Sequence, residues 1–168
     1  SLSSASIANP SAFPLSTTVY VVEVTDGNAC SQVDSMTLTV LPLPNANAGA
    51  DQAICIGDTL QLQASGGVSY SWEPQTSLSD ATVSDPFASP SSTTDYIVTV
   101  IGANTCVNTD TMNVLVNPLP FLDAGNDTSV CIGSSLVLQT QGTGQFRWEL
   151  VPGIASLQTP NPTVNPTI

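Results

Sequence analysis

The sequence predicts an all-β chain built from 76-residue β-sandwich repeats, and three observations support that prediction. Placing Ser1 on Ser77 aligns positions 1–92 with 77–168 without a gap, and 35 of the 92 pairs are identical. Hydrophobic residues alternate every second position in short runs, and the 3.6-residue period of a helix is absent. Clusters of Gly, Asn, Asp, Ser and Pro separate the runs, as turns do. A fixed period of this length is the signature of a repeat architecture.

Two Leu-Pro segments, 43–44 and 119–120, are the predicted joints between repeats. Proline fixes φ and cannot extend the hydrogen bonding of a sheet, so these segments are expected to be short, fairly stiff linkers. Cutting there gives a complete repeat at 45–120. Residues 1–44 are then the C-terminal half of a preceding repeat, and 121–168 are the N-terminal half of a following one. We therefore expect the chain to be a window on a longer tandem array.

The expected strands of the complete repeat follow from the two-residue alternation. In 59–63, Leu60 and Leu62 face inward, and 135–139 repeats this pattern. In 69–73, Tyr70 and Trp72 share one face. Two later runs, 96–100 and 111–116, alternate in the same way. Six or seven short strands around one central Trp predict an immunoglobulin-like sandwich, in which Tyr96 occupies the place of a tyrosine corner.

Composition excludes several classes of function. The chain has no Lys, no His, one basic residue (Arg147) and a net charge of −12. Such a chain cannot neutralise phosphates or anionic lipid, so no nucleic-acid partner is predicted. Without His it lacks the usual general base and metal ligand, and no catalytic residue and no enzyme activity are predicted. No apolar run reaches the ~20 residues of a membrane span, so no membrane insertion is expected.

Several motifs carry a resemblance to a known family. They are Ala48-Gly49-Ala50-Asp51, Ile54-Cys55-Ile56-Gly57-Asp58, Tyr70-Ser71-Trp72-Glu73-Pro74 and Thr94 to Val100 followed by Cys106. The chain resembles the tandem Ig-like and PKD-like repeats of very large Bacteroidota surface proteins, including gliding-motility adhesins and other type IX secretion cargo. The resemblance covers the whole chain. It implies a secreted protein, extracellular or on the cell surface.

The four cysteines occur as one pair per repeat, without a Cys-x-x-Cys motif or a His, which favours disulfides over metal. Four cysteines allow three internal pairings. The family pattern favours Cys55 with Cys106, leaving Cys30 and Cys131 to pair outside this stretch. A bridge between neighbouring repeats and free thiols are the alternatives.

Asp followed by Ser or Thr and an apolar residue occurs three times, with hydroxyls at Ser35, Thr59 and Thr111. This pattern resembles the Bacteroidota O-glycosylation sequon and predicts glycosylation there; the alternative is that the Asp merely begins a strand. Asp51 and Asp127 are the candidates for calcium, although no EF-hand loop is present and solvated turn residues are the other interpretation. No other cofactor or metal is predicted.

The sequence therefore predicts a structural repeat module of a long extracellular stalk, fibre or adhesin filament. Its expected partners are neighbouring repeats of the same chain and other copies in a filament. The alternatives are a carbohydrate- or surface-binding adhesive module, with Phe13 and Phe87 as its loop aromatics, and a spacer attached to an enzyme domain elsewhere.

Overall fold

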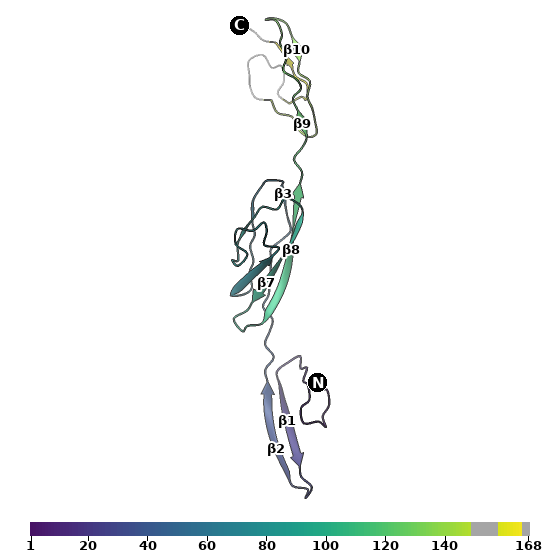
Figure 1. The fold of residues 1–168 in the computed structure, drawn as a ribbon, viewed down its shortest axis with the longest axis vertical. Coiled ribbons are helices and arrows are strands. Elements are labelled where there is room, and N and C mark those ends of the chain that lie inside the picture. The colour runs from purple at the N-terminus through teal and green to yellow at the C-terminus, as the bar shows by residue number, and fades with distance from the viewer. Residues whose placement is uncertain (149–157, 166–168) are drawn as a thin grey trace. The chain divides into compact units, whose positions relative to one another are not determined.

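The computed structural model describes residues 1–148 and 158–165, and these form an all-β protein without helices. The chain divides into two compact units, Ser1–Val116 and Asn117–Ile168, each described below by itself (Figure 1). No helix of the described part is long and apolar enough to cross a membrane. The boundaries proposed at 44/45 and 120/121 remain predictions.

The first unit begins with an antiparallel hairpin of β1 (Thr18–Thr25) and β2 (Ser31–Leu38). Its register runs from Thr18 opposite Leu38 to Thr25 opposite Ser31. The Asp26 carboxylate closes the turn, because its Oδ1 accepts the backbone N–H groups of Asn28 at 2.8 Å and of Cys30 at 2.9 Å. We call this element the N-terminal hairpin.

The rest of the first unit contains a four-stranded sheet and a two-stranded sheet that faces it. The strands are β3 (Gln52–Cys55), β4 (Leu60–Gln61), β5 (Ser69–Glu73), β6 (Phe87–Ala88), β7 (Thr94–Ile101) and β8 (Val107–Asn117). The larger sheet has the order β3-β8-β7-β5, and the smaller one pairs β4 with β6. We call residues 45–120 the central repeat.

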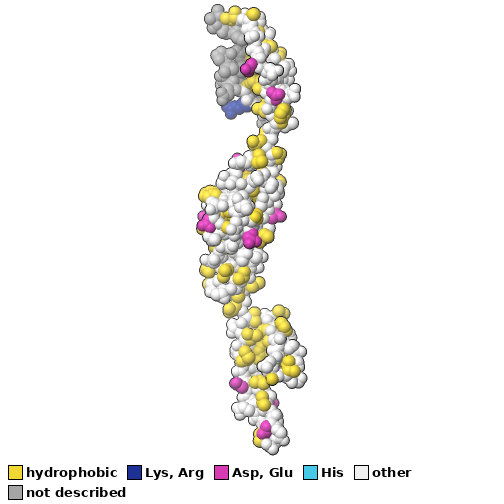
Figure 2. Space-filling view, in the orientation of Figure 1, with side chains coloured by type: hydrophobic (Ala, Val, Ile, Leu, Met, Phe, Trp, Pro, Cys, Tyr) yellow, Lys and Arg dark blue, Asp and Glu magenta, His cyan; other side chains and the backbone are white. Residues whose placement is uncertain are grey.

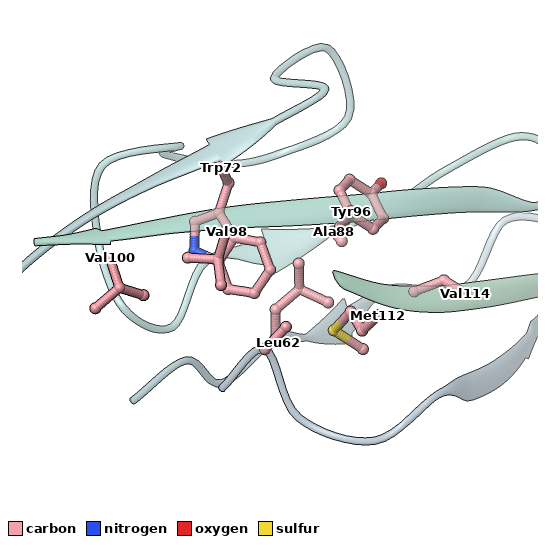
Figure 3. Close-up of a cluster of buried hydrophobic side chains, with 9 residues drawn as sticks. Leu62, Trp72, Ala88, Tyr96, Val98, Val100, Met112 and Val114 are labelled. Atoms are coloured by element: carbon pink, nitrogen blue, oxygen red, sulfur yellow. The ribbon is translucent and has the colours of Figure 1, made fainter. Parts of the chain in front are cut away.

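The core of the central repeat lies between these two sheets (Figure 3). Trp72 on β5 and Tyr96 and Val98 on β7 are fully buried, and Leu62, just beyond β4, is 1% exposed. On β8 the burial alternates, with Met112 and Val114 inward. The other buried members are Ala48, Ala88 and Val100. The inward phases predicted for Trp72 and for the long strands β7 and β8 are therefore confirmed.

The polar atoms of the two buried aromatic residues have partners. The Trp72 Nε1–H donates to the carbonyl of Val83 at 3.0 Å. The Tyr96 hydroxyl shares a hydrogen bond with Ser77 Oγ. A buried donor without a partner costs free energy, so these bonds let large aromatic side chains fill the core without that penalty.

The second unit contains four short strands in two antiparallel pairs among its described residues. They are β9 (Leu122–Asp123), β10 (Leu136–Val137), β11 (Gln141–Gly142) and β12 (Thr163–Val164). Strand β9 pairs with β11, and β10 pairs with β12. We call residues 121–168 the C-terminal half-repeat.

Many local hydrogen bonds recur one repeat further along the chain. The Trp148 Nε1–H donates to Thr159 at 3.0 Å, as Trp72 does to Val83. The pairing of Leu60 with Ala88 recurs as Leu136 with Val164. On the N-terminal side, the isolated bridge between Leu2 and Ala12 matches that between Leu78 and Ala88, and Thr17 and Thr93 accept equivalent bonds from Val40 and Val116. The sequence repeat is thus accompanied by recurring local structure.

The segment leading into β3 runs in the same direction as β8. The backbone N–H of Ala48 donates to Asp110 Oδ2, and the N–H of Asn113 donates to Asp51 Oδ1, both at 2.8 Å. Both bonds join residues 62 positions apart. In a parallel pair of strands the difference between the numbers of bonded residues stays constant, whereas in an antiparallel pair their sum stays constant.

Candidate functional site

In the first unit, two side chains of the central repeat bond to the linker, which we take here as Pro42-Leu43-Pro44. Asn104 Nδ2–H donates to the carbonyl of Pro42 at 2.8 Å, and Asn108 Nδ2–H donates to the carbonyl of Pro44 at 3.0 Å. Asn104 lies in the turn between β7 and β8, and Asn108 lies on β8 itself. A proline lacks a backbone N–H, so its carbonyl is the only backbone group through which hydrogen bonds can hold it.

The end of the linker is also packed against a glycine. Gly66 has φ of +105°, and a Cβ there would lie 1.9 Å from the carbonyl oxygen of Asn45. At the equivalent position, Gly142, a Cβ would lie 2.7 Å from the carbonyl oxygen of Phe121. Asn45 and Phe121, the first residues of 45–120 and 121–168, therefore each lie against the backbone of a glycine. Such a close approach is possible because glycine has no side chain.

A second feature is the apolar surface of the N-terminal hairpin. Val22 and Val24 are 57% and 65% exposed, and Met36 is 62% exposed. Figure 2 shows hydrophobic side chains along this element with few charges among them. Contiguous apolar patches on a protein surface commonly mark interaction sites.

All four cysteines are free thiols, so the Cys55–Cys106 disulfide favoured by the family pattern is not present. The parallel course of β3 and β8 supplies the reason. The offset of 62 places Cys55 near Asn117, at the end of β8, whereas Cys106 precedes its start. At ~3.3 Å per residue the two lie about 36 Å apart along the strand, far beyond the 4.4–6.8 Å between Cα atoms that a disulfide needs. Within one repeat this bridge cannot form, and pairing of Cys30 and Cys131 with residues elsewhere stays a prediction.

The three predicted glycosylation positions are all exposed. Ser35 lies on β2, Thr59 directly precedes β4, and Thr111 lies on β8 beside the buried Met112. The expected accessibility is therefore confirmed, while glycosylation itself stays a prediction.

The Asp residues of the same three motifs have structural roles. Asp34 Oδ1 accepts the N–H of Ser35, and Asp58 Oδ2 accepts the N–H of Cys55. Asp110 Oδ2 accepts the N–H of Ala48. The alternative interpretation of the motif, in which the Asp merely begins a strand, does not hold for Asp34 and Asp110, which lie within β2 and β8, whereas Asp58 lies two residues before β4.

The two calcium candidates lie in different units, and each is described by itself. Asp51 accepts the N–H of Asn113, and Asp127 is exposed in the C-terminal half-repeat. Among the described residues there is no group of three or more His, Cys, Asp or Glu that could hold a metal ion.

Phe13 and Phe87, the aromatic residues proposed for an adhesive site, are both exposed. Phe13 is 68% and Phe87 53% exposed, whereas Trp72 and Tyr96 are fully buried. A shallow depression of Pro, Ser and Thr residues lies near the start of β7, and its lining includes neither Phe. Neither Phe therefore contributes to that depression.

Sequence reasoning missed Asn104 and Asn108 and the surface of the hairpin. A signal for Asn104 existed, because Asn28 is its identical counterpart one repeat earlier. No protein-family model matches the chain, and no curated protein shows significant sequence similarity to it.

Proposed function

We propose that this chain is a run of tandem immunoglobulin-like repeats that serves as a structural module of an extracellular stalk, fibre or adhesin filament. The observation that carries the proposal is the linker, which two asparagines of the central repeat hold through the carbonyls of Pro42 and Pro44. A linker fixed at both prolines transmits orientation from one repeat to the next, which is the property a stalk requires.

The immunoglobulin-like assignment rests on the central repeat. The strand order β3-β8-β7-β5, faced by β4 and β6, corresponds to strands C, F and G with an additional first strand beside G, faced by B and E. Trp72 lies on the strand that corresponds to C and is buried. Tyr96 lies near the start of the F-like strand, where a tyrosine corner lies, but its hydroxyl bonds the side chain of Ser77, 19 residues upstream, and not nearby backbone.

The compartment and the partners are proposed from the sequence. The resemblance to Bacteroidota surface repeats, the single basic residue and the Ser-, Thr- and Asn-rich surface all suit a secreted, non-catalytic protein. Its partners are then neighbouring repeats and further copies in a filament. The adhesive alternative needs an aromatic binding surface, and a glycan array that compares the chain with Phe87→Ala tests it directly.

Small-angle scattering of the 168-residue chain at high dilution tests the structural proposal. A single compact globule of this length has a radius of gyration of about 15 Å. Repeats arranged in series give a clearly larger value, so a measured radius no larger than that of the compact globule overturns the proposal.

A variant series tests the linker specifically. The double variant Asn104→Ala, Asn108→Ala removes both bonds to the linker carbonyls and should broaden the distance distribution from scattering. Asn28→Ala is the matched control, because it alters the same repeat position in the hairpin turn, away from the Pro42 and Pro44 carbonyls. Identical distributions for the double variant and the original chain would show that the asparagines do not stiffen the joint.

A further inference from the structure

The chain enters and leaves the central repeat at opposite ends of one strand. It enters through the linker, which is hydrogen-bonded to Asn104 and Asn108 near the start of β8. It leaves at Asn117, where β8 ends. At ~3.3 Å per residue, the two ends of this 11-residue strand lie about 33 Å apart. Tension in the chain therefore acts on the repeat along the direction of β8.

A series of hydrogen bonds joins the entering segment, residues 42–55, to β8 and to the turn before it. After the two linker bonds, the N–H of Ala48 donates to Asp110 Oδ2. Three residues further along both sides, the N–H of Asn113 donates to Asp51 Oδ1. Strand β3 completes the series, because it is the neighbour of β8 in the sheet. We call this series of bonds the seam.

The two sides of the seam run in the same direction, since their bonded residues lie 62 or 64 positions apart throughout. Tension pulls the entering segment toward its N-terminal end and β8 toward its C-terminal end. The two sides can then separate only by sliding past each other, and every bond of the seam crosses the line of sliding. All of the bonds are therefore strained together. If both pulling points lay at the same end, the bonds would break one after another.

The carboxylate bonds are the strongest attachments of the seam. A hydrogen bond to an ionised carboxylate is roughly twice as strong as one between neutral groups. Asp110 is partly buried, and Ala48, whose N–H it accepts, is fully buried in the core. Water competes poorly for a bond in this position, and competition from water is what makes an exposed hydrogen bond weak. The bond between Ala48 and Asp110 thus ties the seam to the core.

We propose that the seam is a mechanical clamp that keeps the central repeat folded when the chain is under tension, with Asp51 and Asp110 as its main attachments. Resistance to force depends on the rate of unfolding rather than on the equilibrium stability. Bonds that must all break before the entering segment slides raise the barrier to that unfolding. The seam therefore gives the repeat a resistance to tension that packing of the core does not by itself provide.

Residues of the seam recur along the sequence. Identical residues stand 76 positions before or after six of its members, at Asn28, Asp34, Pro118, Pro120, Ala124 and Asp127. We therefore expect the same clamp in successive repeats of the proposed stalk. The inference rests on that proposed function and deepens it, because a stalk that is anchored at one end and pulled at the other places its repeats under tension.

Single-molecule force spectroscopy of the full chain tests the proposal. Cys30, Cys106 and Cys131 are replaced by Ser, which leaves the thiol of Cys55 for attachment. In the first geometry the handles are peptide tags at the two ends of the chain, so the seam is sheared. In the second geometry one handle is attached to Cys55, at the end of β3, and the other to the C-terminal end of the chain. The force then acts at Cys55 and Asn117, at the same end of the seam, and the bonds break in turn.

Unfolding of the central repeat is recognised by the length of chain that it releases. Residues 45–117 span about 260 Å when fully extended, so end-to-end unfolding lengthens the chain by about 230 Å. At one loading rate, this event should need at least twice the force that unfolding needs in the second geometry. The comparison uses an unaltered seam and therefore needs no destabilised variant.

A variant series tests the two carboxylates. At constant force, the double variant Asp51→Ala, Asp110→Ala should unfold at least about tenfold faster than the original chain, because two hydrogen bonds to charged groups are lost. Asp110→Asn keeps an acceptor oxygen for the N–H of Ala48 and should unfold at an intermediate rate. Asp80→Ala is the matched control, because Asp80 likewise accepts a backbone N–H, that of Thr82 at 2.8 Å, outside the seam. It should unfold within about twofold of the original rate under the same force.

Circular dichroism and urea unfolding verify that each variant is folded. Equal unfolding forces in the two geometries, or a double variant that unfolds at the original rate under force, would overturn the proposal. End-to-end unfolding of the central repeat without a measurable force peak would overturn it as well. The scattering test concerns the arrangement of successive repeats, whereas this test concerns a single repeat, so either can fail without the other.

Discussion

Replacing Trp72 by Ala tests whether the central repeat has the core described above. The indole is fully buried, and its Nε1–H donates to the carbonyl of Val83 at 3.0 Å. The substitution removes the largest side chain of the core and leaves that carbonyl without its donor.

The expected loss follows from the burial. Deleting a buried Trp costs about 3–5 kcal/mol, a large part of the ~5–15 kcal/mol by which a small domain is stable. For a domain of this size 1 kcal/mol corresponds to roughly 4–8 °C, so the melting temperature should fall by more than about 12 °C.

Trp148→Ala is the matched comparison. Trp148 makes the same bond, to Thr159, but is only partly buried in the chain. Its replacement should therefore lower stability less. Differential scanning calorimetry measures both variants without relying on Trp fluorescence. A fall of less than about 3 °C for Trp72→Ala, or an equal fall for the two variants, would refute the assignment of Trp72 to the core.

Three further outcomes are expected. Tyr96→Phe removes a hydrogen bond to Ser77 and should cost about 1 kcal/mol in urea unfolding, whereas Tyr20→Phe should be neutral or stabilising, because the buried Tyr20 hydroxyl has no partner among the described residues. Hydrogen bonds from the backbone of Cys30 and then of Asn28 hold the pKa of Asp26 below its ordinary value, so the hairpin turn should keep this stabilisation above the unfolded-state pKa and lose it as pH falls through the lowered pKa. Amide exchange of the turn measures this pH dependence, and a dependence that persists unchanged in Asp26→Asn would contradict the assignment. Protein from its native source should carry O-glycans at the three predicted hydroxyls, and proteolytic fragments that contain these residues and have the mass of the bare polypeptide would exclude them.

Alternation in the sequence was sufficient to predict the inward faces of the long strands. It placed Trp72, Tyr96 and Met112 inside, and all three are buried. It also placed Thr111 outside, where it is exposed. These predictions succeeded because the side chains of a strand alternate between faces regardless of what the strand pairs with.

The cysteines and the linker could not be predicted in the same way. The Cys55–Cys106 pairing depended on which end of the repeat each residue occupies, and that depends on the direction of β3 relative to β8. The bonds from Asn104 and Asn108 to the linker connect residues more than 60 positions apart. Neither feature follows from local periodicity, because both require the fold to bring distant segments together.

The N-terminal hairpin and the C-terminal half-repeat show where the alternation stops being informative. Val22 has the same identity and phase as Val98, yet one is mostly exposed and the other fully buried.

The contrast extends to secondary structure. The segment 145–148 keeps the aromatic residues of β5 at the same phase, Phe146 for Tyr70 and Trp148 for Trp72, and still is not a strand. The Trp148 bond to Thr159 nevertheless forms as in the central repeat, since both of its partners belong to the half-repeat. Hydrogen bonds whose two partners both lie in the half-repeat are thus retained. The pairing that β5 makes with β7 in the central repeat has no counterpart among the described residues of the half-repeat. The segment 145–148 thus keeps the aromatic pattern of β5 without being a strand, which indicates that strand formation here depends on a partner strand rather than on side-chain propensity alone.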